Sequence, residues 1–309
     1  MSIILHSYKH DRSALEVSGD ETDTFLNDIL TAELVSLPAG KMQMSCLLSP
    51  QGRILHDMLI YRIRANCYWI EVASTQIIEL KKRITMYRLR KAITIEILEN
   101  WHSAHLYHQD GSALSAKQIT QIKDDLNDNQ LVFEDSRRPE LGLHIICKEH
   151  KINLQNQGWE DVDLVKWESL RIANMVPSGE IDLSPNRTLM LEANLDLFQA
   201  VDFQKGCYIG QEVTARTKYR GLVKKKLVPV SCAKKLHKET LIFQNGKEVG
   251  VCHSSVKLED GRYLALATLR LDALKSNINN QIEFVSNTQS VILELPSWYE
   301  SDVLNDKLL

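Results

Sequence analysis

Apolar and polar positions alternate with two different periods in the first third of the chain. Residues 42–70 form short apolar runs interrupted by Pro-Gln-Gly at 50–52, which is typical of antiparallel strands joined by a turn. In residues 76–90, apolar side chains recur at Ile77, Leu80, Ile84 and Tyr87, the spacing of one helix face. This pattern predicts a meander of strands with a helix covering one face.

The rest of the chain changes character near residue 222. Before that point we predict helices at residues 19–31 and 162–175, a strand at 93–98, short strands within 129–146, and a surface helix or loop at 115–130. From Lys224 onward, short strands separated by turn residues predict a small barrel or sandwich. We therefore expect an α+β protein with one domain at 1–222 and a second at 223–309.

Composition narrows the class of protein. The 309 residues are 44% hydrophobic and 25% charged, which is typical of a folded soluble protein. The formal net charge of -3 calls for neither a nucleic-acid nor a membrane partner. The N-terminal apolar run is short for a signal peptide, and no stretch approaches the ~20 apolar residues of a membrane helix. We therefore expect a cytoplasmic protein without a membrane partner.

The six cysteines are scattered, with no C-x-x-C pair among them. This spacing argues against a disulfide framework and against a resident zinc or iron–sulfur ligand set, so no metal site is predicted. Five of the six lie in apolar or alternating contexts, where cysteine is usually a small core residue. Cys207 is the exception.

Cys207 lies in the stretch KGCYIGQE, residues 205–212, which is polar and rich in glycine. The ammonium of Lys205 and the start of the helix predicted over VTARTKY would both favour a thiolate here. A structural cysteine in a tight turn fits the same residues. Composition alone does not decide between a reactive and a structural thiol.

The longer run AVDFQKGCYIGQEVTARTKYRG resembles the signature of the YgfZ family of folate-binding proteins, whose hallmark is K-G-C-Y-x-G-Q-E. Within that family it is similar to the mitochondrial-type branch, which assists iron–sulfur cluster maturation. The match is unbroken over the hallmark and extends, more weakly, over nearly the whole chain. The family belongs to the superfamily of the glycine-cleavage T-protein, an aminomethyltransferase. The resemblance implies two α+β units and a C-terminal β-barrel domain around a central folate channel.

The resemblance also implies a set of folate-binding residues. TLMLEANL resembles the segment that holds the pterin in aminomethyltransferases, which gives that role to Glu192. A carboxylate can accept two adjacent pterin N–H groups, although a surface glutamate ending a strand is the alternative. Lys205, Tyr208 and Asp57 complete the predicted site for tetrahydrofolate or a one-carbon derivative.

One departure from the superfamily bears on activity. Aminomethyltransferases carry paired aspartates where this chain reads GRILHD, so His56 replaces the first aspartate and Asp57 remains. Histidine donates as well as accepts hydrogen bonds and has a different pKa, so it does not simply substitute for a carboxylate. If the lost residue is the catalytic one, transferase activity is not expected.

Three functional hypotheses follow. The first is a folate-binding accessory protein for iron–sulfur cluster assembly or repair, with assembly proteins or client enzymes as partners and Cys207 as the reactive group. The second is a tetrahydrofolate-dependent aminomethyl or methyl transferase, and the third is a scaffold without chemistry. The basic cluster at residues 81–91 fits plain solvation or attraction of a folate glutamate tail, and the cluster at residues 216–226 fits an acidic partner protein or RNA. The lack of a stacking motif disfavours nucleic acid.

Overall fold

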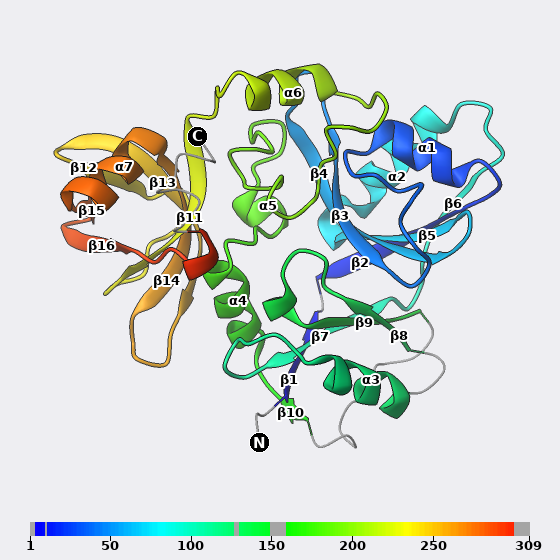
Figure 1. The fold of residues 1–309 in the computed structure, drawn as a ribbon, viewed down its shortest axis with the longest axis horizontal. Helices are drawn as coiled ribbons and strands as arrows, with labels where there is room; N and C mark the ends of the chain where they lie inside the picture. Colours follow the sequence, from blue (N-terminus) through cyan, green and yellow to red (C-terminus); the bar gives the residue numbers. More distant parts are fainter. Residues whose placement is uncertain (1–3, 10, 127–129, 149–158, 300–309) are drawn as a thin grey trace. The chain divides into compact units, whose positions relative to one another are not determined.

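The computed structural model describes residues 4–9, 11–126, 130–148 and 159–299, and it divides into two compact units (Figure 1). The first unit takes the chain up to Leu164 together with Asp196–Gln211. The second takes Val165–Leu195 and the chain from Glu212 onward. Residues 205–211 of the signature stretch therefore belong to the first unit, and its last residue, Glu212, belongs to the second.

The first unit contains a five-stranded sheet in the order β3-β4-β5-β2-β6, with every neighbouring pair antiparallel. Its strands are β2 (Arg12–Ser18), β3 (Met42–Leu48), β4 (Ile54–Arg64), β5 (Cys67–Ala73) and β6 (Thr94–Ile97). Helices α1 (Thr22–Ile29) and α2 (Ile77–Arg88) pack on one face through buried apolar side chains, α2 following the short 3₁₀ turn η1 (Ser74–Gln76). The helix stripe predicted for residues 76–90 is confirmed, because Ile77, Leu80 and Ile84 all point into this core.

A second five-stranded sheet completes the first unit, in the order β10-β1-β7-β9-β8. Its strands are β1 (Ile4–Lys9), β7 (His102–His108), β8 (Leu131–Glu134), β9 (Leu143–Cys147) and β10 (Glu160–Asp161), with the 3₁₀ turn η2 (Pro139–Leu141) between β8 and β9. Helix α3 (Ala116–Asp125) packs on it through Ile122. A capping box formed by Ser115 and Gln118 starts α3, so the stretch predicted as a surface helix or loop contains a helix. Residues 127–129 of that stretch lie outside the described residues.

Buried polar side chains connect the two sheets. Tyr61 of β4 donates to Glu71 of β5 at 2.8 Å and lies 3.3 Å from Nδ1 of His144 in β9. Nε2 of His144 is 2.8 Å from Asp135, which also pairs with Arg137 at 2.6 Å. Burial raises the pKa of Asp135, but the charge of Arg137 and the contact with His144 outweigh burial and hold that pKa well below its usual value. The charges are thus paired inside the core, as burial requires.

The second unit is built on a closed barrel in the order β11-β14-β13-β12-β15-β16. Its strands are β11 (Lys225–Cys232), β12 (Leu241–Gln244), β13 (Lys247–Lys257), β14 (Tyr263–Arg270), β15 (Phe284–Ser286) and β16 (Gln289–Leu293). The remaining helices are α4 (Leu164–Ala173), α5 (Gly179–Asp182), α6 (Gln211–Tyr219) and α7 (Leu271–Asn280). Ile172 of α4 packs on Leu227, Val256 and Leu266 of the barrel.

The expected α+β class with a C-terminal barrel is confirmed. The pattern analysis missed several elements, most of them short or polar: β1, β2, β7, β10, β15, α5 and α7. The division into domains at residue 222 stays a proposal.

Candidate functional site

The signature stretch is held against the loop that follows α1. Oδ1 of Asp202 accepts hydrogen bonds from the backbone N–H groups of Gln204 at 2.6 Å and Lys205 at 3.1 Å. These hydrogen bonds close an Asx turn. The backbone N–H of Asp202 donates to the carbonyl of Thr31 at 3.0 Å. The hydroxyl of Thr31 in turn donates to the carbonyl of Ala200 at 2.6 Å. These hydrogen bonds fix the position of residues 200–205.

Lys205 makes the most specific of these contacts. Its Nζ donates to the backbone carbonyls of Asn27 at 2.6 Å, Leu30 at 2.7 Å and Ala32 at 2.7 Å. Asn27 lies in the last turn of α1 and Leu30 is its C-cap, where carbonyls lack partners within the helix and the helix dipole favours a cation. Ala32 lies in the loop that follows. Burial lowers the pKa of Lys205 to about 8. The ammonium, expected to bind cofactor and to activate the thiol, has its three N–H groups directed to the backbone.

Tyr208 is buried beside the ammonium group of Lys205. Nζ of Lys205 lies 5.3 Å from the centre of the Tyr208 ring, a cation–π distance. Only 6% of Tyr208 is exposed, and its hydroxyl finds no hydrogen-bond partner among the described residues. Burial raises the pKa of Tyr208, and the neighbouring Asp202 and Cys46 raise it further. A buried hydroxyl without a partner is costly, which makes this oxygen a natural contact for a ligand.

Asp57 lies in the same neighbourhood through Cys46. The two residues are opposite each other on β4 and β3, so their side chains share a face of the sheet. Burial raises the pKa of Cys46, and the charge of Asp57 raises it further. Asp57 thus raises the pKa of Cys46, and Cys46 in turn raises the pKa of Tyr208. The structure brings these two predicted site residues to one region of the first unit.

His56 points the other way. Successive strand residues face opposite sides of a sheet, so His56 faces the helix-covered side while Asp57 does not. Nδ1 of His56 is 2.8 Å from the side-chain oxygen of Gln76, and burial lowers the pKa of His56. Only one of the two positions in GRILHD therefore faces Cys46.

Cys207 is exposed, and the other five cysteines, all within the described residues, are buried. The expectation that the other five are core residues is confirmed. Gly210 has φ +81°, and a Cβ added there would lie 2.6 Å from the carbonyl oxygen of Ser49, so a glycine is required. Gly206 has open space around it. The chain after Cys207 is thus fixed against the β3–β4 turn, while the chain just before it tolerates a side chain.

Glu192 belongs to the second unit and is half-buried in a run of turns. Its backbone carbonyl accepts from the N–H of Leu227 at 2.9 Å, and Nδ2 of Asn194 donates to the carbonyl of Leu227 at 2.5 Å. Asn194 is fully buried, and its Oδ1 has no hydrogen-bond partner among the described residues. Sequence reasoning missed Asn194, although an asparagine two residues after Glu192 was visible in TLMLEANL.

No group of three or more His, Cys, Asp or Glu side chains in the described part of the chain is arranged to hold a metal ion. No described helix has the length and apolar character needed to cross a membrane.

Comparisons with known proteins agree with the fold. Residues 10–133 match the GCVT N-terminal domain, and residues 224–301 match the C-terminal beta-barrel domain of CAF17. The solved aminomethyltransferase T of the glycine cleavage system from Bartonella henselae superposes with a TM-score of 0.74 at 13% identity, covering 96% of this chain and 86% of that one. The chain therefore has an aminomethyltransferase-like fold. Its resemblance to the YgfZ family in particular stays a prediction.

Curated relatives are named as iron-sulfur cluster assembly factors. The mouse mitochondrial factor IBA57 is 25% identical over 93% of this chain and 83% of its own length. Human IBA57 is 29% identical, over 71% of this chain and 64% of its own length. A Neurospora crassa homologue of IBA57 is 29% identical over 71% of this chain, which spans about half (51%) of that relative.

The expected cytoplasmic location is contradicted by these relatives, because all three are named as mitochondrial proteins. The error has a simple source. Net charge and the lack of long apolar runs are common to soluble proteins of both compartments, so composition does not separate them.

Proposed function

We propose that this chain is a tetrahydrofolate-binding accessory protein in the assembly or repair of iron–sulfur clusters, with Cys207 as its reactive group. The observation that carries the proposal is the exposure of Cys207 in a loop anchored on both sides, while the other five cysteines are buried. The names of the relatives support the cluster-assembly role. The aminomethyltransferase-like fold supports a folate site.

The residues present suit a folate. The unpartnered hydroxyl of Tyr208 can donate to a ligand oxygen or nitrogen, and the buried carboxylate of Asp57 lies in the same region. Glu192 accepts the pterin N–H groups in this proposal, and Lys205 acts by holding the loop. Tetrahydrofolate, when bound, supplies a carrier for one-carbon groups.

Cys207 acts by brief contact with a partner. A single exposed thiol offers one ligand, whereas protein-bound iron–sulfur clusters are held by several. In this proposal, Cys207 touches a cluster or a sulfur atom that an assembly protein or client enzyme carries.

The role of Cys207 is tested by complementing a strain deficient in cluster maturation. Wild type should restore cluster-dependent enzymes, Cys207→Ala should not, and Cys147→Ala, which removes a buried thiol from the second sheet, should. In the purified protein, limiting iodoacetamide should label Cys207 first. Full complementation by Cys207→Ala would refute the proposal.

Folate binding is tested separately by calorimetry with tetrahydrofolate. Glu192→Ala should weaken binding about 10-fold or more, because a charge-assisted pair contributes about 1.5–3 kcal/mol. Glu248→Ala, which removes an exposed carboxylate from β13, is the matched control. Equal affinity in wild type and Glu192→Ala would remove Glu192 from the site without affecting the role of Cys207.

A further inference from the structure

The turn that ends α2 is strained. Leu89 has φ 52° and ψ -113°, and the N–H of Lys91 donates to the carbonyl of Arg88 at 3.0 Å. This is a hydrogen-bonded turn whose first central residue adopts the type II′ conformation, which favours glycine. Burial does not compensate for the strain, because 83% of Leu89 is exposed. The chain holds a leucine in a costly conformation and directs it into solvent.

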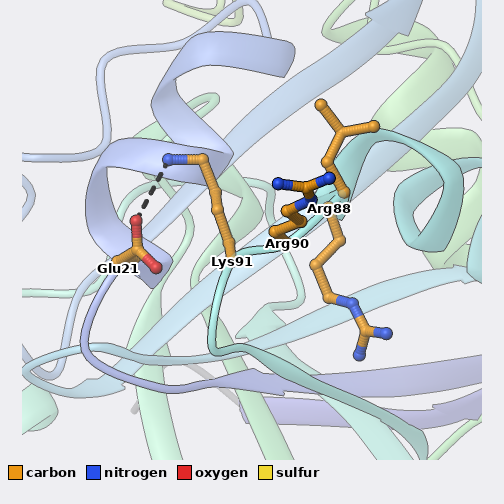
Figure 2. Close-up of a pocket in the computed structure, with 5 residues that line it drawn as sticks. Glu21, Arg88, Arg90 and Lys91 are labelled. Carbon is orange, nitrogen blue, oxygen red and sulfur yellow. Dashed lines mark hydrogen bonds and ion pairs between the residues drawn. The ribbon is translucent and has the colours of Figure 1, made fainter.

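The same turn lines a pocket of about 500 Å³, formed by Glu21, Arg88, Leu89, Arg90 and Lys91 (Figure 2). The charge of Glu21 is already met, since its carboxylate pairs with Lys91 at 3.4 Å and accepts the N–H of Ala92 at 3.1 Å. Arg90 makes no hydrogen bond or ion pair within the described part of the chain, whereas Arg88 donates through Nη1 to the carbonyl of Ile93 at 2.9 Å and its Nε is buried. Arg90 therefore presents unused donors to an anion at this pocket.

Apolar side chains extend this surface along α2. Met86 is 65% exposed and Ile78 is 67% exposed, and with Leu89 they continue along the outer side of the helix. Residues 81–91 carry six basic side chains and no acidic one. The surface thus combines aliphatic contacts with positive charge, in a chain whose net charge is -3.

We propose that the pocket and the outer side of α2 bind an acidic peptide segment of a partner protein. One of its carboxylates pairs with Arg90, and an aliphatic side chain packs on Leu89 and Met86. Charge complementarity selects an acidic partner, and the aliphatic contacts select a protein. A single-stranded nucleic acid would call for exposed aromatic rings, and the exposed apolar residues of this surface are aliphatic.

Fluorescence anisotropy with the full chain tests the proposal. The probe is a short fluorescein-labelled peptide of alternating leucine and glutamate, and the reference probe has glutamine in place of glutamate. The acidic probe should bind with a Kd on the order of micromolar and more weakly as salt rises, while the reference probe should not bind. Arg90→Glu should weaken binding about tenfold or more, because it replaces attraction with repulsion.

Two further variants separate binding from folding. Leu89→Gly should weaken binding at least about threefold without lowering the melting temperature, because glycine adopts this conformation readily. Lys117→Glu, an exposed charge reversal on α3, should bind as wild type does. Tighter binding of fluorescein-labelled oligothymidylate than of the peptide, or peptide binding that neither Arg90→Glu nor Leu89→Gly weakens, would overturn the proposal.

Discussion

Replacing Lys205 by methionine should loosen the signature loop. The substitution keeps the stem of the side chain and removes three hydrogen bonds to carbonyls at 2.6–2.7 Å. Hydrogen bonds to charged groups contribute about 1.5–3 kcal/mol each, or about 5–9 kcal/mol in sum if they were additive. The variant also recovers the several kcal/mol that desolvating an ammonium costs, so a net loss of about 1–3 kcal/mol is expected.

The stability of the Lys205→Met variant should be measured near neutral pH. The folded pKa of Lys205, about 8, lies below its ordinary value of 10.5, so the desolvation cost of the charge is present below pH 8. That cost disappears as pH rises from about 8 to 10.5, because the amine of the folded protein then loses its proton. A neutral amine also has only two N–H donors in place of three. At pH 7 the amine of Lys205 is charged and keeps all three N–H donors.

Urea unfolding followed by circular dichroism gives the change in stability, and hydrogen exchange of residues 27–32 and 202–208 localises it. Gln204→Met, an exposed neighbour, is the matched control and should behave as wild type. Lys205→Arg should recover only part of the loss, because a planar guanidinium does not converge on three carbonyls as an ammonium does. A Lys205→Met protein within about 0.5 kcal/mol of wild type, with unchanged exchange in both segments, would refute this account of the loop.

Four other substitutions test further features of the protein. Gly210→Ala should lower the free energy of unfolding by more than about 1 kcal/mol, whereas Gly206→Ala should change it by less than about 0.5 kcal/mol, as measured by urea unfolding. Tyr208→Phe should leave the stability of the ligand-free protein unchanged or higher but weaken tetrahydrofolate binding in calorimetry, because the lost hydroxyl has no protein partner. Since the folded pKa of Asp135 is depressed, its contribution is present above about pH 4 and is lost as pH falls further; thermal melts should show that Asp135→Asn reduces this acid sensitivity.

Local patterns predicted the parts of the fold that local physics determines. The stripe at Ile77, Leu80 and Ile84 identified α2, because a helix covering a sheet must bury every third or fourth residue. Strand β2 escaped notice although Leu15 and Val17 are fully buried, because its place is fixed by pairing with β5 and β6, far away in the sequence. The exposure of Cys207 was expected from the polar, glycine-rich signature.

The tertiary contacts that hold the loop of Cys207 in place were not predictable in the same way. The carbonyls that receive Lys205 lie more than 170 residues earlier in the chain, and no spacing rule connects a lysine with backbone atoms at such a separation. The same holds for Tyr208, which is buried although it lies in a polar, glycine-rich stretch. Residue type indicated where the chemistry lies, and only tertiary contacts show what holds it in place.

The three carbonyls around Nζ of Lys205 have a counterpart in ion coordination. Carbonyl oxygens converging on one point replace the hydration shell of a potassium ion in ion-selective proteins. Here the end of α1 and the loop after it offer such a set, and the chain fills it with its own ammonium group. Lys205→Ala would remove the tethered cation and keep the oxygens. Ammonium chloride should then restore exchange protection of residues 202–208, and tetramethylammonium chloride, whose cation has no N–H group, should not. Lys205 therefore supplies, tethered to the chain, the cation that these oxygens coordinate, and we expect the order of the wild-type loop not to depend on cations in solution.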